Sequence, residues 1–259
     1  MKRLLLVGAA ACWLGGAPSA LGTDMPINVT KAPLPPPIFT WTSCYLGGHV
    51  GGGWTHKDLT DPIQVVQDSL SAAPVTSGVT TVSVNPTGVV VGGQFGCDYQ
   101  FAASLVTGFE VGASGSTMKG SANIALPLGL PGESALVTAR TDFLYGATAR
   151  LGYAADRWLL YVRGGVALAD DKYAFTGAFT GIPFDFEGLD QRLGWTVGAG
   201  VEWAFAGHWS VDLQYDFYDF GHHNVLMSDS VNAVSGPANF KQTVQVVKLG
   251  LNFHMWGLQ

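Results

Sequence analysis

Three groups of side chains in this chain of 259 residues have types and spacings that could do chemistry. Cys44 and Cys97 could form a disulfide. The adjacent His222 and His223 could bind a metal ion or a haem iron, because neutral imidazole is a common metal ligand. The third group consists of charged residues scattered through apolar, glycine-rich segments, and these could form ion pairs. The sequence contains no nucleophile elbow, no pair of metal ligands at a useful spacing and no phosphate-binding loop, so we expect no enzyme.

The composition limits the functions that these groups could have. Hydrophobic residues make up 47% of the chain and charged residues 12%, about half the charged share of an ordinary soluble domain. High hydrophobicity with few charges excludes intrinsic disorder. The formal net charge of −6 argues against nucleic-acid binding, because neutralising phosphates requires a basic surface. The composition therefore favours contact with lipid.

The N-terminal region has the pattern of an exported protein. Lys2 and Arg3 precede an apolar stretch and then small residues, which predicts a secretory signal peptide at residues 1–22. Cleavage two residues earlier is the alternative. Residues 23–42 contain the run KAPLPPP and are expected to form an extended, proline-rich periplasmic segment. The remaining residues, 43–259, are expected to form one domain.

That domain must position the reactive groups on strands. After the signal peptide no apolar run approaches the roughly 18 residues of a spanning helix, and the only other structure that satisfies the backbone in a bilayer is a closed barrel. Segments of about ten residues with period-two alternation are typical of such barrels. We expect strands at residues 44–54, 88–100, 105–115, 142–153, 158–168, 193–205, 209–218 and 243–254.

The connections between these segments alternate in length. Residues 101–104, 154–157 and 206–208 form short connections, whereas residues 55–87, 116–141, 169–192 and 219–242 are long. Aromatic residues cluster at both ends of the expected strands, as they do at the two membrane interfaces. The sequence therefore predicts an all-β fold: an eight-stranded antiparallel transmembrane β-barrel with short periplasmic turns and four long extracellular loops. A secreted soluble barrel is the alternative, and it would need an apolar lumen and a polar exterior.

If apolar side chains face lipid, the charged ones at alternating positions face the lumen. Glu202 and Asp212 are expected opposite each other across a tight turn, with Arg163 and Lys248 neutralising them from either side. Eight strands leave an interior just wide enough for side chains, so a charge network is expected to plug the barrel. Its expected members are Glu110, Arg150, Arg163, Glu202, Asp212 and Lys248. The alternative is a thin channel lined by solvated charges.

The two cysteines share the outward face near the periplasmic ends of neighbouring expected strands. Neighbouring antiparallel strands bring such positions within reach of a disulfide, and the periplasm is oxidising. We therefore expect a Cys44–Cys97 disulfide, with two free thiols facing lipid as the alternative. His222 and His223 lie in the fourth long loop, where they are either a hemin contact at the cell surface or a solvated pair.

Several motifs resemble one known family. Residues 35–48 (PPPIFTWTSCYLGG) resemble the start of the alphaproteobacterial outer-membrane immunogenic, or porin-family, proteins. The same similarity covers residues 92–96 (GGQFG), 194–202 (GWTVGAGVE) and 247–254 (VKLGLNFH). The resemblance implies an eight-stranded barrel related to the transmembrane domain of outer membrane protein A. Family members are surface antigens and envelope proteins, some hemin-binding and some credited with pores. Cys44 departs from the family pattern, as do the five residues after His254.

The sequence thus predicts an integral protein of the cell outer membrane, without catalytic activity. We expect a structural, envelope and surface-display role, with a narrow pore or a surface hemin-binding protein as alternatives. The expected partners are outer-membrane lipid and the barrel-assembly machinery, and self-association is an option that the sequence leaves open. No cofactor is expected unless hemin binds.

Overall fold

The computed structural model describes residues 39–60, 81–125, 134–179, 182–231, 235–256 and 258. The expected signal peptide and most of the proline-rich segment lie outside these residues. The first strand begins at Ser43. No helix among the described residues is long and apolar enough to cross a membrane.

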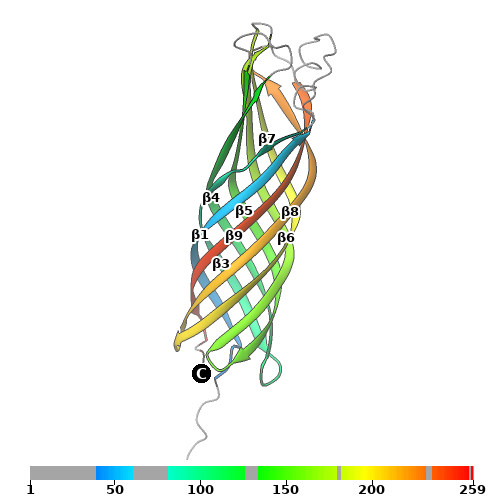
Figure 1. Ribbon diagram of the computed structural model, residues 1–259. Helices are drawn as coiled ribbons and strands as arrows, with labels where there is room; N and C mark the ends of the chain where they lie inside the picture. Colours follow the sequence, from blue (N-terminus) through cyan, green and yellow to red (C-terminus); the bar gives the residue numbers. More distant parts are fainter. Residues whose placement is uncertain are drawn as a thin grey trace, which may run out of the picture. The chain divides into compact units, whose positions relative to one another are not determined.

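The described chain forms one antiparallel sheet that closes on itself (Figure 1). The strands are β1 (Ser43–Thr60), β2 (Thr81–Val84), β3 (Thr87–Gln100), β4 (Leu105–Ala125), β5 (Ser134–Ala155), β6 (Trp158–Phe179), β7 (Ile182–Ala206), β8 (Trp209–Asp229) and β9 (Ser235–His254). Their order is β2-β1-β3-β4-β5-β6-β7-β8-β9, and β1 also pairs with β9. Because β2 is a four-residue strand separated from β3 only by Asn85 and Pro86, the ring contains eight long strands. The expected eight-stranded antiparallel barrel is confirmed.

Side-chain direction decides whether the barrel suits lipid. Leu213 and Leu249 point outward and are 51% and 53% exposed, whereas Asp212 and Lys248 point inward and are 2% and 5% exposed. The outer surface also carries exposed aromatic rings near the short turns, such as Trp158, and others toward the opposite end. An apolar exterior around a polar interior is the arrangement of a membrane barrel and the reverse of a soluble one.

The strands are much longer than expected, and much of what was expected as loop is paired strand. In the expected loop 169–192, for example, β6 and β7 pair continuously from Ala169↔Arg192 to Phe179↔Ile182. The reason is that the hydropathy pattern reverses: beyond the membrane portion the apolar rings of Tyr173 and Phe175 face inward, while the charged Lys172 faces outward. Segments with apolar side chains on the inner face were therefore expected to be loops. The true connections are correspondingly shorter than the four long loops expected.

We call the end of the barrel with the short turns the turn end and the opposite end the loop end. Pairing irregularities separate the membrane portion from the loop end, at Gly115/Met118 and at Thr141/Phe143. Such bulges add one residue to one strand and re-aim its side chains. On β5 the inward side chains accordingly change from even-numbered positions such as Leu144 to odd-numbered positions such as Ala139, whereas on β4 the even-numbered Glu110 and Met118 both face inward.

The β7–β8 pair shows the largest irregularity. Its pairing stops at Trp195↔Asp219 and resumes at Glu187↔Ser228. Near it, Gly221 has a positive φ of 61°, a conformation that favours glycine.

Candidate functional site

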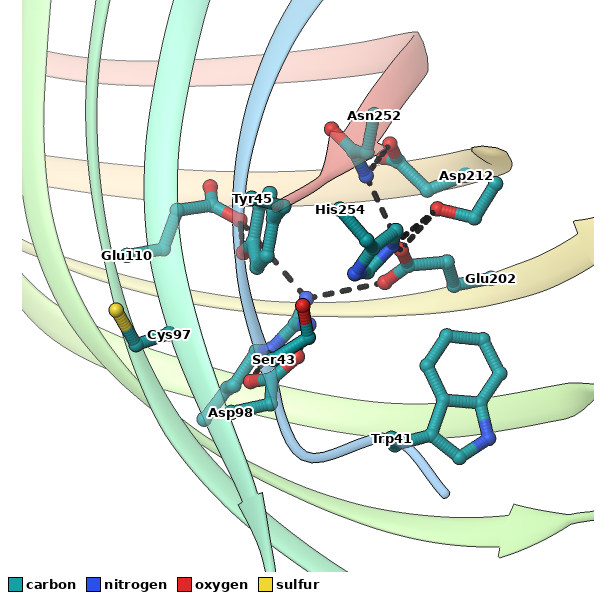
Figure 2. A network of polar contacts seen from close by, with 12 residues as sticks. Trp41, Ser43, Tyr45, Cys97, Asp98, Glu110, Glu202, Asp212, Asn252 and His254 are labelled. Atoms are coloured by element: carbon teal, nitrogen blue, oxygen red, sulfur yellow. Dashed lines mark hydrogen bonds and ion pairs between the residues drawn. The ribbon is translucent and has the colours of Figure 1, made fainter. Parts of the chain in front are cut away.

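The barrel interior is organised around one arginine. The Arg150 side chain is buried, and its Nε donates to Asp98 Oδ1 at 2.6 Å while Nη2 binds the second oxygen of the same carboxylate. Its Nη1 donates to Glu202 Oε2 at 3.2 Å. Figure 2 shows Asp98 and Glu202 converging on this point from different strands. A planar guanidinium suits this role because its fork of donors can bind two carboxylates at once.

Two further cations form ion pairs with carboxylates on the inner face of the barrel. Arg163 Nη1 lies 2.6 Å from Glu110 Oε1, and its Nε lies 3.2 Å from Asp216 Oδ1. Lys248 Nζ lies 2.7 Å from Asp216 Oδ2. These residues form what we call the lumen charge cluster: Asp98, Glu110, Arg150, Arg163, Glu202, Asp212, Asp216 and Lys248.

All six residues expected in the lumen network are buried, but their partners differ from those expected. Glu202 and Asp212 are opposite each other in register. Arg163 and Lys248 do not neutralise them, because these cations pair with Glu110 and Asp216 instead. Arg150 neutralises Glu202. The Asp212 carboxylate is held by amides, with Asn252 Nδ2 at 3.0 Å and Gln94 Nε2 at 3.3 Å.

Sequence reasoning missed the uncharged members of this site. Tyr45 OH donates to Glu110 Oε2 at 2.7 Å, and the Arg150 guanidinium lies over the Tyr45 and Tyr161 rings at 4.8 and 4.9 Å. Ser210 Oγ donates to Glu202 Oε1 at 2.5 Å. These residues share the inward parity of the charged ones, so the same alternation contains the signal that would have found them.

Glycines on the wall give the inward carboxylates their space. A Cβ at Gly250 would collide with Asp212 Oδ1, and a Cβ at Gly108 would collide with Asp98 Oδ1. In a barrel of eight strands the interior is narrow, so long side chains facing inward need small residues opposite them.

Apolar side chains close the lumen on both sides of the lumen charge cluster. On the turn-end side the layer consists of Trp41, Val106, Ala154, Leu159, Tyr161, Ala204 and Leu258. On the loop-end side it consists of Val90, Met118, Leu144, Ala167, Ala169, Tyr218, Phe220, Val244 and Val246. A further apolar cluster, which includes Phe175, Phe186 and Phe240, fills the loop end. The interior is therefore a stack of apolar and ionic layers.

Residues before β1 and after β9 complete the closure at the turn end. Trp41 is fully buried, its Nε1 donates to the Asp156 carbonyl at 3.1 Å and its backbone N–H donates to Gln100 Oε1 at 2.9 Å. Figure 2 shows Trp41 on the segment that leads into β1, beside the charged residues. The backbone N–H of Leu258 donates to the Gly207 carbonyl at 2.6 Å. Both flanking segments thus cover the interior.

The expected disulfide is confirmed. Cys44 and Cys97 are directly opposite in the β1–β3 register and are bonded, with a Cα–Cα distance of 3.9 Å. The bond joins β1 to β3 close to the turn end.

His222 and His223 are exposed at the loop end and use different partners. His222 Nδ1 lies 3.2 Å from Asn239 Oδ1 on β9. His223 Nδ1 lies 3.0 Å from Asp190 Oδ2 on β7 and so bridges the interrupted β7–β8 pairing. The described residues contain no group of three or more His, Cys, Asp or Glu side chains that could hold a metal ion.

A second ionic group lies nearer the loop end, beyond the expected membrane span of residues 44–54. Lys57 Nζ lies 2.7 Å from Asp171 Oδ1 and 4.6 Å from the centre of the Tyr173 ring. Arg192 Nε lies 2.6 Å from Asp190 Oδ2. These side chains were expected in loops, because polar residues such as His56 and Gln191 occupy the outward positions beside them.

Burial makes Lys57 sensitive to pH. Removal of water from the ammonium lowers the pKa of Lys57 to about 8, whereas an unfolded lysine titrates near 10.4. Between these values the unfolded chain binds more protons, so the free energy of unfolding should rise with pH, by on the order of 1–2 kcal/mol. Urea unfolding at about pH 7.5 and about pH 9.5 measures this rise. Lys57→Met should abolish it, and the exposed control Lys241→Met should retain it; equal profiles for both variants would contradict it.

The features described so far define a class of protein. A closed antiparallel ring with leucines and aromatic rings outside and ion pairs inside is an integral β-barrel of an outer membrane. Comparison with known families agrees with this assignment: the model of the outer membrane protein beta-barrel domain matches residues 41–253. The chain belongs to this family, and the protein is integral to the outer membrane. In such barrels short turns face the periplasm, so the turn end is the periplasmic end.

Individual proteins are also similar to the chain. The 31 kDa outer-membrane immunogenic protein of Brucella melitensis is 28% identical over 98% of this chain and 99% of its own length. Among solved structures, the outer membrane protease OmpT of Escherichia coli has a TM-score of 0.44 and 8% identity, over 84% of this chain and 98% of that chain. The outer membrane protein OprG of Pseudomonas aeruginosa has a TM-score of 0.43 and 11% identity, over 83% and 98%.

Proposed function

We propose that the protein is a closed, non-conducting barrel that serves the structure of the envelope and displays its loop end at the cell surface. One observation carries the proposal: Arg150, Asp98 and Glu202 meet as buried side chains across the interior. A solute crossing the barrel would have to break these pairs. Separating a buried ion pair leaves an uncompensated charge, which costs several kcal/mol.

The apolar layers add to the barrier. An ion that passed the lumen charge cluster would next meet the layer around Met118 and Tyr218, and on the other side the layer around Trp41 and Leu258. Transfer of an ion into an apolar environment is strongly unfavourable. The alternation of layers therefore supports a structural role over the narrow-pore alternative.

The buried serine and histidine do not support catalysis. Ser210 Oγ donates to Glu202 Oε1 at 2.5 Å, and His254 Nε2 lies 2.9 Å from the same Ser210 oxygen. In a catalytic triad the carboxylate orients the second ring nitrogen of the histidine. Here His254 Nδ1 has no hydrogen-bond partner in the described part of the chain, and Ser210, Glu202 and His254 are fully buried. We therefore propose a non-enzymatic protein.

Planar-bilayer recording tests the closed barrel. The folded monomer is expected to insert without steady conductance, because ionic and apolar layers of side chains lie across its lumen. A general porin in the same bilayer serves as the positive control, and the heat-dependent shift of the folded band on a gel verifies that the inserted protein is folded. A steady unit conductance from the monomer would overturn the proposal.

A further inference from the structure

Three cations lie side by side on the outer surface of the loop end. Lys119 of β4 is opposite Arg140 of β5, and Arg140 is opposite Lys172 of β6. Neighbouring strands lie about 4.8 Å apart, so the three Cα atoms fall within about 10 Å. All three side chains are exposed. We call Lys119, Arg140 and Lys172 the cation row.

The stability of the fold does not explain this arrangement. Like charges on directly opposite strand positions are destabilising, and the whole chain has only 13 Lys and Arg residues. Asp142, placed at the β5 bulge, pairs with Arg140 and with Lys172 Nζ at 2.9 Å. A single carboxylate serves two of the cations, and Lys119 has no ion pair with any residue that the structure describes. The row therefore retains a positive excess on its β4–β5 side.

The height of the row on the barrel indicates what it faces. Phe143, exposed and stacked on Tyr145 at 6.1 Å, lies just below Arg140 on β5. Such rings sit at the level of lipid headgroups. The cation row thus lies where the headgroups of the outer leaflet begin.

A hollow beside the row adds an apolar component. A pocket of about 560 Å³ is lined by all three cations and by Leu189. Leu189 is opposite Lys172 in register and is 76% exposed. Glu187 of β7 and Asp229 of β8 line the same pocket, and Asp170 on β6 accepts from Gln191. An anion would therefore bind at the β4–β5 side, away from these carboxylates.

We propose that the cation row binds the phosphorylated headgroup of an outer-leaflet glycolipid, with an acyl chain of the lipid against Leu189 and Phe143. Lysine and arginine bind phosphate oxygens through charge-assisted hydrogen bonds, and clusters of basic residues at the membrane surface bind anionic headgroups. The ligand class is an anionic amphiphile, because cations and exposed apolar side chains adjoin in one place. The inference goes beyond the proposed envelope role, and a barrel that conducts would not affect it.

Lipid binding to the full-length folded protein tests the proposal. The protein is placed in phosphatidylcholine nanodiscs that contain increasing amounts of bisphosphorylated lipid A, and bound lipid is counted by native mass spectrometry. Binding should weaken about fivefold for each cation removed. The triple variant Lys119→Gln/Arg140→Gln/Lys172→Gln should therefore bind roughly 100-fold more weakly. The matched control is Lys241→Gln, an exposed loop-end lysine on β9, and it should bind like the wild type.

Two further binding measurements show whether the phosphate must belong to a lipid. Dephosphorylated lipid A should bind poorly, and excess inorganic phosphate should not displace lipid A, because it lacks the acyl component. If the triple variant does not fold, as judged by the heat-dependent band shift, the single Lys119→Gln variant gives the expected fivefold loss. The proposal is overturned if Lys119→Gln and Lys241→Gln bind equally, if dephosphorylated lipid A binds as well, or if phosphate alone displaces the lipid.

Discussion

Replacing Arg150 by alanine should lower the free energy of unfolding by about 3–5 kcal/mol, because it leaves buried carboxylates without their cation. Arg150 binds Asp98 through two nitrogens and Glu202 through a third. Both carboxylates are buried, so water cannot take over the role of the guanidinium. The loss should exceed that of any single exposed charge, which is usually within about 0.5 kcal/mol.

Urea unfolding in lipid vesicles, followed by tryptophan fluorescence, measures this loss. The matched control is Arg157→Ala, which removes an exposed arginine from the β5–β6 turn and should leave the midpoint unchanged. The double variant Arg150→Met/Asp98→Leu should recover part of the loss, because it removes charge and partner together. A loss below about 1 kcal/mol for Arg150→Ala would show that solvent reaches the lumen charge cluster.

The sequence allowed the membrane portion of the fold to be predicted. There, alternation gave the side of each residue: Asp212 inward, Leu213 outward, Lys248 inward. Period two is a local property of a strand, so it needs no knowledge of the partner strand. The Cys44–Cys97 disulfide followed from the same parity together with the position of both cysteines near the periplasmic ends of neighbouring antiparallel strands.

The ion-pair partners could not be predicted in the same way. Alternation places Arg163 and Lys248 in the lumen, but the choice between Glu202 and Asp216 as partner depends on strand register and tilt around the ring. Arg163 on β6 reaches Glu110 on β4, two strands away in the sheet. Such contacts are set by the closure of the barrel, which no local pattern encodes.

The loop end was missed for a different reason. Above the membrane interface the barrel faces water, so its apolar side chains turn inward, as Phe175 and Val225 do. On β5 the bulge at Thr141/Phe143 also shifts the alternation by one residue. A search for strands with apolar outer faces ends where polar residues begin to occupy the outward positions, and it assigned Lys57 and Arg192 to loops although both are buried.

The second large effect is expected at the disulfide. Cys44 and Cys97 are 53 residues apart, and a loop of this length corresponds to about 4 kcal/mol of lost chain entropy in the unfolded state. The first hairpin is where such a bond matters, because β1 and β3 share twelve register pairs, whereas β6 and β7 share twenty-two. Cys44→Ser/Cys97→Ser should therefore lower the free energy of unfolding by about 4 kcal/mol.

Reduction of the wild type provides the matching measurement, because it breaks the same bond without changing any side chain of the sheet. Unfolding midpoints in urea with and without reductant should differ by as much as those of the wild type and the double serine variant. The serine variant itself should not respond to reductant. Equal midpoints for oxidised and reduced wild type would contradict the expected contribution of the disulfide to the free energy of unfolding.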